Sequence, residues 1–259
     1  MDSLNEGLGG CYERIILSHI IKRLAQERGA KSILEADATF IAGIPGFNSC
    51  ILAQAGYDVT VLVRERDYED TKAVWNMLNL KATIVPYSYP FPFKDNQFDF
   101  VWNHLVFEHY QHPSPLIPEM KRVSRNTIMT TTLGPYSPGF ILHYLIHKAQ
   151  KKYWDHGYPN MCTIEAMKQE FRYVGLEVVE TGALDVPPWQ DTVDGQIGDS
   201  MTYIAPMPKA ARDRWVWVSA DPRCQEHKIV KLFWEWEQTL PRWFKILVAH
   251  HLYVVGVKR

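Results

Sequence analysis

The chain of 259 residues lacks several features that would assign it to a specialised class of protein. It has four cysteines, Cys11, Cys50, Cys162 and Cys224, and no C-x-x-C pair, so neither a disulfide framework nor a zinc knuckle is expected. Its formal net charge is −1, and its lysines and arginines form no basic stripe of the kind that a nucleic-acid backbone requires. We therefore expect free thiols in a reducing compartment and no nucleic-acid partner.

Long apolar segments are absent as well. The first ten residues, MDSLNEGLGG, lack the basic and apolar regions of a signal peptide. The most apolar stretch near the end, 243–257, is interrupted by Lys245, His250 and His251 and is not expected to span a membrane. These patterns predict a cytoplasmic protein without a membrane partner, and they give no indication of its oligomeric state.

The chain does contain a regular alternation of predicted strands and helices. The predicted strands of the first half are 32–36, 58–63, 82–85, 98–103 and 127–132. The predicted helices around them are 12–28, 48–55, 71–80 and 116–124. Strand 58–63 is apolar at nearly every position, which is typical of a strand buried on both faces. Alternation at this spacing predicts an α/β fold with a doubly wound, mostly parallel sheet.

After residue 133 the alternation loosens. Helices are predicted at 140–152, 163–174 and 225–240, with a sixth strand at 176–180. The chain closes on an apolar run at 251–258, which predicts a final strand. The tryptophan-rich stretch 185–223 has no regular pattern.

A polar stretch follows strand 98–103 directly, and ligands of open α/β sheets bind at such carboxyl ends of strands. The segment from Phe91 to Arg125 reads FPFKDNQFDFVWNHLVFEHYQHPSPLIPEMKRVSR. It resembles the fourth-strand region of class I S-adenosylmethionine-dependent methyltransferases, in particular the small-molecule methyltransferase type. The matching residues are Pro92, Phe93, Asp95, Phe98, Asp99, Val101, Glu108, His109, Glu119, Arg122 and Val123.

The resemblance implies a fold and an activity. It implies a seven-stranded sheet in which the last strand, 251–258, runs antiparallel beside the fifth. The whole chain, 1–259, is then one domain, with a cofactor-binding core at 30–133 and insertions on the acceptor side at 134–162 and 185–249. The implied cofactor is S-adenosylmethionine, and the implied reaction is methyl transfer to a small-molecule or peptide acceptor.

The resemblance also implies where the methionine end of the cofactor would be held. The family has an acid and a glycine-rich loop after the first strand, and the matching stretch here is LEADATFIAGIPGFNSCILAQAG. Glu35 occupies the acidic position, but Asp37 and Thr39 stand where glycines are usual. Glycines follow only at Gly43 and Gly46, which makes the loop longer. A tight turn that only starts the next helix is the alternative interpretation.

Two further family contacts are altered. Val63 stands where an acid at the end of the second strand usually binds the ribose, and Glu65, two residues later, is the candidate replacement. An exposed ion pair between Glu65 and its flanking arginines is the alternative. After the third strand, Tyr87 stands where the family has an adenine-binding acid, with Ser88 beside it. Packing of Tyr87 in the proline-rich turn is the alternative there.

At the end of strand 98–103, Asn103 and His104 are expected to face the point of methyl transfer. His104 is the candidate general base, because histidine titrates near neutral pH. A polar cap on the strand end is the alternative role. We expect the later segments to supply the acceptor site. Its candidate residues are Tyr136, His143, Trp154, His156, Trp189 and Asp191.

The ten histidines do not form a recognisable metal motif. His143 and His147 are four residues apart, but there is no H-E-x-x-H, so no metal site is expected. The altered cofactor positions leave open a second function, a catalytically silent methyltransferase-like protein that binds a partner through its tryptophan-rich C-terminal region. A nicotinamide-dependent oxidoreductase is disfavoured, because the glycine spacing is wrong and the second strand ends in Val63.

Overall fold

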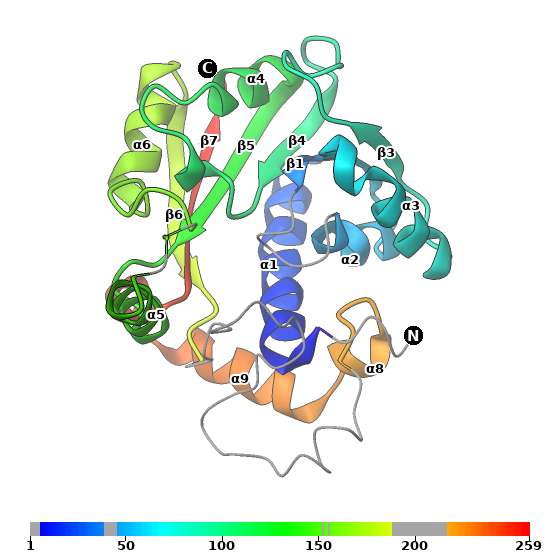
Figure 1. Cartoon of the computed structure of the whole chain (residues 1–259). Helices are drawn as coiled ribbons and strands as arrows, with labels where there is room; N and C mark the ends of the chain where they lie inside the picture. The colour runs from blue at the N-terminus through cyan, green and yellow to red at the C-terminus, as the bar shows by residue number, and fades with distance from the viewer. Residues whose placement is uncertain (1–5, 39–45, 152, 155, 188–216) are drawn as a thin grey trace.

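The computed structural model describes residues 6–38, 46–151, 153–154, 156–187 and 217–259. Its centre is a seven-stranded sheet in the order β3-β2-β1-β4-β5-β7-β6 (Figure 1). The strands are β1 (Ser32–Ala38), β2 (Asp58–Val63), β3 (Thr83–Pro86), β4 (Phe98–Asn103), β5 (Ser124–Leu133), β6 (Glu177–Leu184) and β7 (His251–Val257). The predicted α/β fold class is confirmed.

The C-terminal strand lies inside the sheet rather than at its edge. β7 runs antiparallel to β5, from Thr127 opposite Val257 to Leu133 opposite His251. It runs antiparallel to β6 on its other side. The prediction of a terminal strand antiparallel beside the fifth is therefore confirmed, and β7 supplies backbone hydrogen bonds to two neighbours.

Helices cover both faces of the sheet. They are α1 (Gly7–Glu27), α2 (Cys50–Gln54), α3 (Tyr68–Met77), α4 (Leu116–Val123), α5 (Pro138–Ala149), α6 (Ile164–Tyr173), α8 (Pro222–Gln225), α9 (Lys228–Thr239) and α10 (Arg242–Val248). Short 3₁₀ helices are η3 (Phe47–Ser49), η4 (Glu65–Asp67) and η5 (Phe107–His109). The α1, α2, α3 and α9 helices bury side chains in one core, and α4 and α6 in the other (Figure 1).

Side chains alternate between the two faces of each strand, so the sheet separates two hydrophobic cores. On β1, Ile33 belongs to the core under α1, and Leu34 to the core under α4. Because successive side chains of a strand point to opposite faces, a strand such as β2, which is apolar at nearly every position, contributes to both cores. This explains why the bounds of β2 and β4 match their predicted bounds.

Some predicted helices differ from the observed ones. The segment predicted as helix 48–55 is a 3₁₀ turn, η3, followed by the short α2. The helix predicted at 225–240 is observed as α9, Lys228–Thr239, and Gln225 belongs instead to the short helix α8, which Asp221 caps. In α9 the His227 side chain accepts a hydrogen bond from the backbone N–H of Ile229, which starts a new helix at that point.

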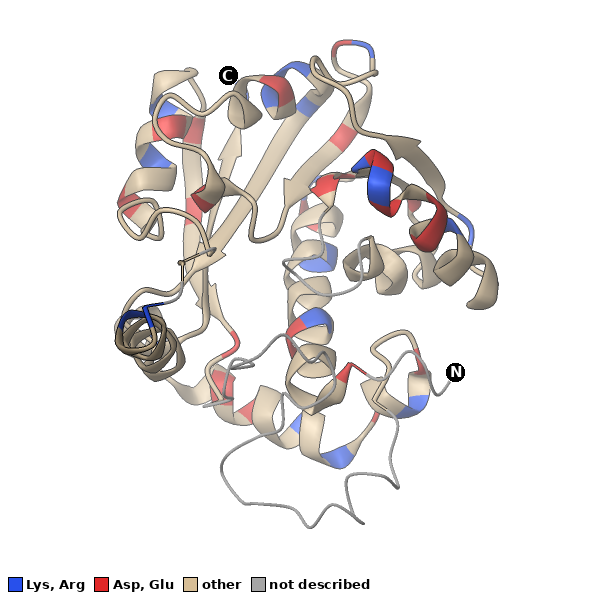
Figure 2. Ribbon diagram, in the orientation of Figure 1, with Lys and Arg blue, Asp and Glu red and all other residues tan. Residues whose placement is uncertain are grey.

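Charged residues of both signs are interspersed along the helices, most densely on η4 and α3 (Figure 2). No helix in the described part of the chain combines the length and hydrophobicity that crossing a membrane requires.

Candidate functional site

A β-bulge breaks the end of β1 at the position of the expected glycine-rich loop. Two residues of β1, Ala36 and Asp37, lie between the paired positions Glu35 and Ala38, where β2 has one residue. Asp37 has a φ of 52°, in the left-handed region that glycine usually occupies. A bulge redirects side chains at a strand end, and bulges are frequent beside active sites.

The bulge places the Asp37 carboxylate in a buried polar network. Arg64, the first residue after β2, donates from Nε to Asp37 Oδ1 over 3.2 Å. The Tyr110 hydroxyl, which follows η5, donates to Asp37 Oδ2 over 3.2 Å. Burial and the Asp37 charge raise the pKa of Tyr110. The carboxyl ends of β1 and β2 are thus joined by an ion pair that is half-exposed on its arginine side.

Tyr87 reaches the same network from the end of β3. Its backbone N–H donates to Val63 O over 2.6 Å, and its ring packs edge-on against Phe91 with centroids 5.8 Å apart. Burial and the Asp37 charge raise the pKa of Tyr87. The predicted cofactor residues Asp37 and Tyr87 therefore lie in one cluster, beside Arg64 and Tyr110.

Glu35 is bonded within the protein at both carboxylate oxygens. Asn48 Nδ2 donates to Oε1 over 3.1 Å, and Ser49 Oγ donates to Oε2 over 2.6 Å. Arg14 Nε in turn donates to Asn48 Oδ1 over 2.9 Å, and Arg14 forms a buried ion pair with Glu6. Burial raises the pKa of Glu35, and the bonds from Ser49 and Asn48 offset this only in part. Glu35 therefore holds η3, the turn that contains Asn48 and Ser49, against the end of β1.

Gly46, which precedes η3, packs closely against side chains of the core. Gly46 has a φ of 71°, and a Cβ there would lie 2.9 Å from Thr71 Cγ2 and 2.9 Å from Val61 Cγ1. The position therefore accepts glycine alone, for reasons of backbone conformation and of packing. Gly43, the other predicted glycine, lies outside the described residues.

Two other predicted cofactor residues are exposed. Glu65 begins η4, one residue beyond Arg64, and its side chain faces solvent. Ser88 is also exposed and donates to Pro90 O over 3.0 Å. The structure brings neither residue into the network around Asp37.

At the end of β4 the two predicted residues are both buried. Asn103 accepts from Thr130 Oγ1 over 2.5 Å, and its amide contacts Met120 Sδ of α4 at 3.4 Å. Both polar groups of Asn103 are thus bonded within the protein. His104 Nδ1 lies 2.7 Å from Thr131 Oγ1, which also accepts from the Leu105 N–H over 3.2 Å.

The other nitrogen of His104 forms a pair with Glu13 of α1, which we call the Glu13–His104 pair. Nε2 contacts Glu13 Oε1 directly. Burial alone would raise the pKa of Glu13, but the charge of His251 and the hydrogen bond from His104 more than offset it, so the pKa lies well below its usual range. Glu13 is therefore ionised, and the Nε2–H of His104 donates to it.

His251, the first residue of β7, completes this group. Its ring lies edge-on to His104 with centroids 5.0 Å apart, and its Nδ1 is 4.0 Å from Asp185 Oδ2. One ligand atom each from Glu13, His104 and His251 lies within 4.8 Å of the others. The group is suited to holding a proton, and its donor set is also one that binds metals.

Three of the predicted acceptor residues are in mutual contact. His143 of α5 and His156 of the following loop have ring centroids 4.6 Å apart, and Trp154 lies 5.7 Å from His143 and 4.8 Å from His156. Tyr136 precedes α5 and is 62% exposed, so it stands apart from them. Trp189 and Asp191 lie outside the described residues.

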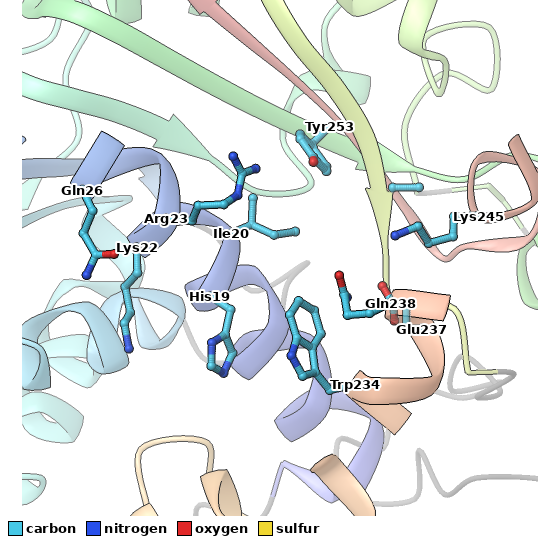
Figure 3. Close-up of a pocket in the computed structure, with 11 residues that line it drawn as sticks. His19, Ile20, Lys22, Arg23, Gln26, Trp234, Glu237, Gln238, Lys245 and Tyr253 are labelled. Atoms are coloured by element: carbon cyan, nitrogen blue, oxygen red, sulfur yellow. The ribbon is translucent and has the colours of Figure 1, made fainter. Parts of the chain in front are cut away.

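A pocket of about 400 Å³ lies between α1, α9 and the β6–β7 edge (Figure 3). At one end His19 and Trp234 stack with centroids 5.4 Å apart, and Lys245 lies across from them. Ile20, also on the wall, is seven residues along α1 from Glu13, or about 10 Å along the helix axis. The pocket is therefore separate from the Glu13–His104 pair.

The sequence interpretation missed Glu13, Arg64 and Tyr110. Arg64 directly follows the position where the family places its acid, and that adjacency was an available signal. Glu13 lies within a helix that was assigned from its apolar stripe alone. Nothing local in the sequence indicates that this part of α1 contacts the end of β4.

Comparisons with known proteins found one family model that matches part of the chain. Residues 42–127 match a family described as a methyltransferase domain. No curated protein matches the sequence.

Solved structures show the same fold at low sequence identity. Magnesium protoporphyrin IX methyltransferase (ChlM) from Synechocystis PCC 6803, with bound SAH, has a TM-score of 0.52 at 12% identity, covering 96% of this chain and 84% of that one. The YcgJ protein of Bacillus subtilis has a TM-score of 0.51 at 13% identity, with 94% and 97% covered. The [4+2]-cyclase SpnF has a TM-score of 0.52 at 14% identity, with 92% and 80% covered. At these identities the likeness establishes the fold.

Proposed function

Because this chain is a class I S-adenosylmethionine-dependent methyltransferase, with a methyltransferase domain at residues 42–127, we propose that it methylates a small-molecule or peptide acceptor. We propose further that the Glu13–His104 pair removes the acceptor's proton. The observation that carries this proposal is the pair itself, a buried histidine at the carboxyl end of β4 bonded to an ionised carboxylate. Ligands of open α/β folds bind at this edge of the sheet.

The strand ends fit a positively charged cofactor. S-adenosylmethionine, when bound, supplies a methyl group made electrophilic by its sulfonium. The carboxylates of Glu35 and Asp37 are buried at this edge, and that of Glu13 is partly covered. Buried carboxylates favour a cation there, because opposite charges attract more strongly away from water.

We assign the contacts with the cofactor to the network at the ends of β1, β2 and β3. Asp37 offers a carboxylate that is held in place by Arg64 and Tyr110. Tyr87 adds an aromatic face beside it. Glu35 and Gly46 shape the loop between β1 and α2, Glu35 through its bonds to Asn48 and Ser49. In this assignment neither Glu65 nor Ser88 contacts the cofactor directly.

The pair is arranged to receive a proton. The Glu13 side chain is 18% exposed and that of His104 is fully covered, so Glu13 is the member of the pair that an acceptor can reach. The Glu13 carboxylate would take the proton, while the hydrogen bonds of His104 to Glu13 and Thr131 hold the pair in place. When a bound cofactor gives its methyl group to an oxygen, nitrogen or sulfur of the acceptor, the pair would take the proton that this atom loses.

The test is a methyl-transfer assay on the full chain. S-adenosylmethionine with a labelled methyl group is incubated with panels of small hydroxyl, amine and thiol compounds and of short peptides. For any acceptor found, His104→Gln should lower kcat by about 10²–10⁴-fold, the usual contribution of a positioned base. Its dissociation constant for S-adenosylmethionine should stay unchanged.

The matched control is His19→Gln, an exposed histidine on α1 outside the pair. It should keep both turnover and cofactor affinity. Wild-type turnover in His104→Gln would show that the pair has no part in proton removal. Labelling of no acceptor by a chain that still binds the cofactor would contradict the proposed acceptor classes.

A further inference from the structure

Three histidines outside the Glu13–His104 pair and outside the network around Asp37 converge on one point, and we call them the histidine cluster. They are His143 and His147 of α5 and His156 of the loop that follows. The Nε2 atoms of His143 and His147 are 2.8 Å apart, and those of His143 and His156 are 3.2 Å apart. All three ligand atoms lie within 4.8 Å of one another.

The local sequence builds this convergence. Ser137 caps α5 by accepting from the Phe140 N–H, and residues four apart on the helix share one face, which aligns His143 with His147. The loop returns through Gly157, whose φ is 78° and whose Cβ would lie 2.6 Å from Glu108 O. Only glycine fits so close to that backbone, and this turn brings His156 against the helix.

The hydrogen bonds of His147 fix its protonation. Its Nδ1 lies 2.9 Å from the backbone carbonyl of Tyr153, which only accepts hydrogen bonds. Nδ1 must therefore carry a proton, so Nε2 is the ring nitrogen of His147 that can offer a lone pair to the cluster. Metal-binding histidines usually donate their second N–H to a carbonyl or carboxylate in this way.

The Nε2 of His143 faces two other imidazole nitrogens, at 2.8 Å and 3.2 Å. A cation at this point would be contacted by one nitrogen lone pair from each of the three rings.

We propose that the histidine cluster is a three-ligand site for a divalent transition metal of the zinc type. Tetrahedral bonds of about 2.1 Å to imidazole nitrogens separate the ligands by about 3.4 Å. The observed separations of 2.8 and 3.2 Å need only a small expansion to reach this value. Three protein ligands leave one tetrahedral position for water or for a nitrogen, oxygen or sulfur atom of a small ligand.

Trp154 covers the cluster on one side. Its ring lies 5.7, 5.4 and 4.8 Å from the rings of His143, His147 and His156, edge-on to each. Phe140 adds a further edge contact to Trp154 at 5.2 Å. An apolar cover limits access of water to the ligands and strengthens their interaction with a cation.

The test is metal binding by the full chain after treatment with a chelator. Calorimetric titration with ZnCl₂ should show one zinc ion bound tightly per chain. Titration with Co²⁺ should give the visible absorption of a tetrahedral site with nitrogen ligands. His147→Ala and His156→Ala, both at half-buried positions, should each weaken binding by at least about 100-fold. Circular dichroism of the metal-free variants should match that of the wild type.

Two control variants separate this site from others. His19→Ala removes an exposed helical histidine and should bind zinc as the wild type does. His104→Ala removes a ligand of the group with Glu13 and His251, and it too should keep the tightly bound zinc ion. The proposal would be overturned if the wild type bound no zinc ion tightly. It would also be overturned if tight zinc binding were lost in His104→Ala and kept in His147→Ala.

Discussion

Arg64 Nε lies 3.2 Å from Asp37 Oδ1, so an ion pair joins the carboxyl ends of β1 and β2. In the family pattern, glycine stands at the first of these positions and an acid stands near the second. Here the acid is on β1, and the residue after β2 is basic. We propose that Asp37, which a β-bulge presents at the end of β1, takes the role that the family gives to an acid on the second strand.

Asp37→Asn should weaken the binding of S-adenosylmethionine about tenfold or more, because a hydrogen bond to a charged group contributes about 1.5–3 kcal/mol. Asparagine also tolerates the left-handed conformation at this position, so the fold should be kept. Calorimetric titration measures the change. Asp70→Asn, at an exposed position of α3, is the control and should bind normally. Normal affinity for S-adenosylmethionine in Asp37→Asn, together with weaker binding in Glu65→Gln, would show that Glu65 makes the contact and Asp37 does not.

Glu35→Ala should destabilise the loop between β1 and α2. The variant leaves Asn48 and Ser49 without their acceptor, and an unpaired buried polar group costs about 1–3 kcal/mol. Urea unfolding should show this loss, and S-adenosylmethionine should bind more weakly by a similar free energy. Unchanged cofactor affinity in a destabilised Glu35→Ala would limit Glu35 to a structural role.

Glu108 should make the stability of the protein depend on pH. Burial raises its pKa to about 7, and the Thr132 hydroxyl and Leu133 backbone lower it only in part. A raised carboxyl pKa gives stability that is complete below the unfolded value near 4.5 and is lost as the pH rises through 7.

Glu108→Gln removes this titration. Between pH 5 and pH 8 the wild type should lose about 2–3 kcal/mol more of its unfolding free energy than the variant, at 1.36 kcal/mol per pKa unit. Urea unfolding at the two pH values gives the difference. Parallel pH profiles of the two proteins would show that Glu108 does not carry a raised pKa.

Removal of β7 should unfold the sheet. The strand pairs with β5 and β6 along its whole length, so deleting residues 251–259 leaves both neighbours without backbone partners. Circular dichroism and thermal melting should show no cooperative transition. A truncated chain with a wild-type melting curve would show that β7 is not part of the core.

The fold was predictable where one segment carries its own signal. β2 is apolar at nearly every position, β4 is apolar apart from Asp99 until it ends at Asn103, and the final strand is an apolar run after His251. The site was less predictable because it depends on contacts between distant segments. Asp37 is notable in sequence only as an acid in a glycine position, and the bulge that directs it is visible only in the pairing with β2.

The histidine cluster shows the same limit. The spacing of His143 and His147 is visible in the sequence, but the third member arrives through the turn at Gly157. The proton on His147 Nδ1 follows from a carbonyl whose position only the folded loop defines. The sequence therefore predicted no metal site, and the geometry is what indicates one.

The measurement that tests the account most directly is a calorimetric titration of the full chain with S-adenosylmethionine. Each chain should bind one molecule of S-adenosylmethionine saturably. S-adenosylhomocysteine should displace it, and Asp37→Asn should weaken its binding. A folded wild-type chain that gives no heat of binding and no rise in melting temperature with S-adenosylmethionine would contradict it.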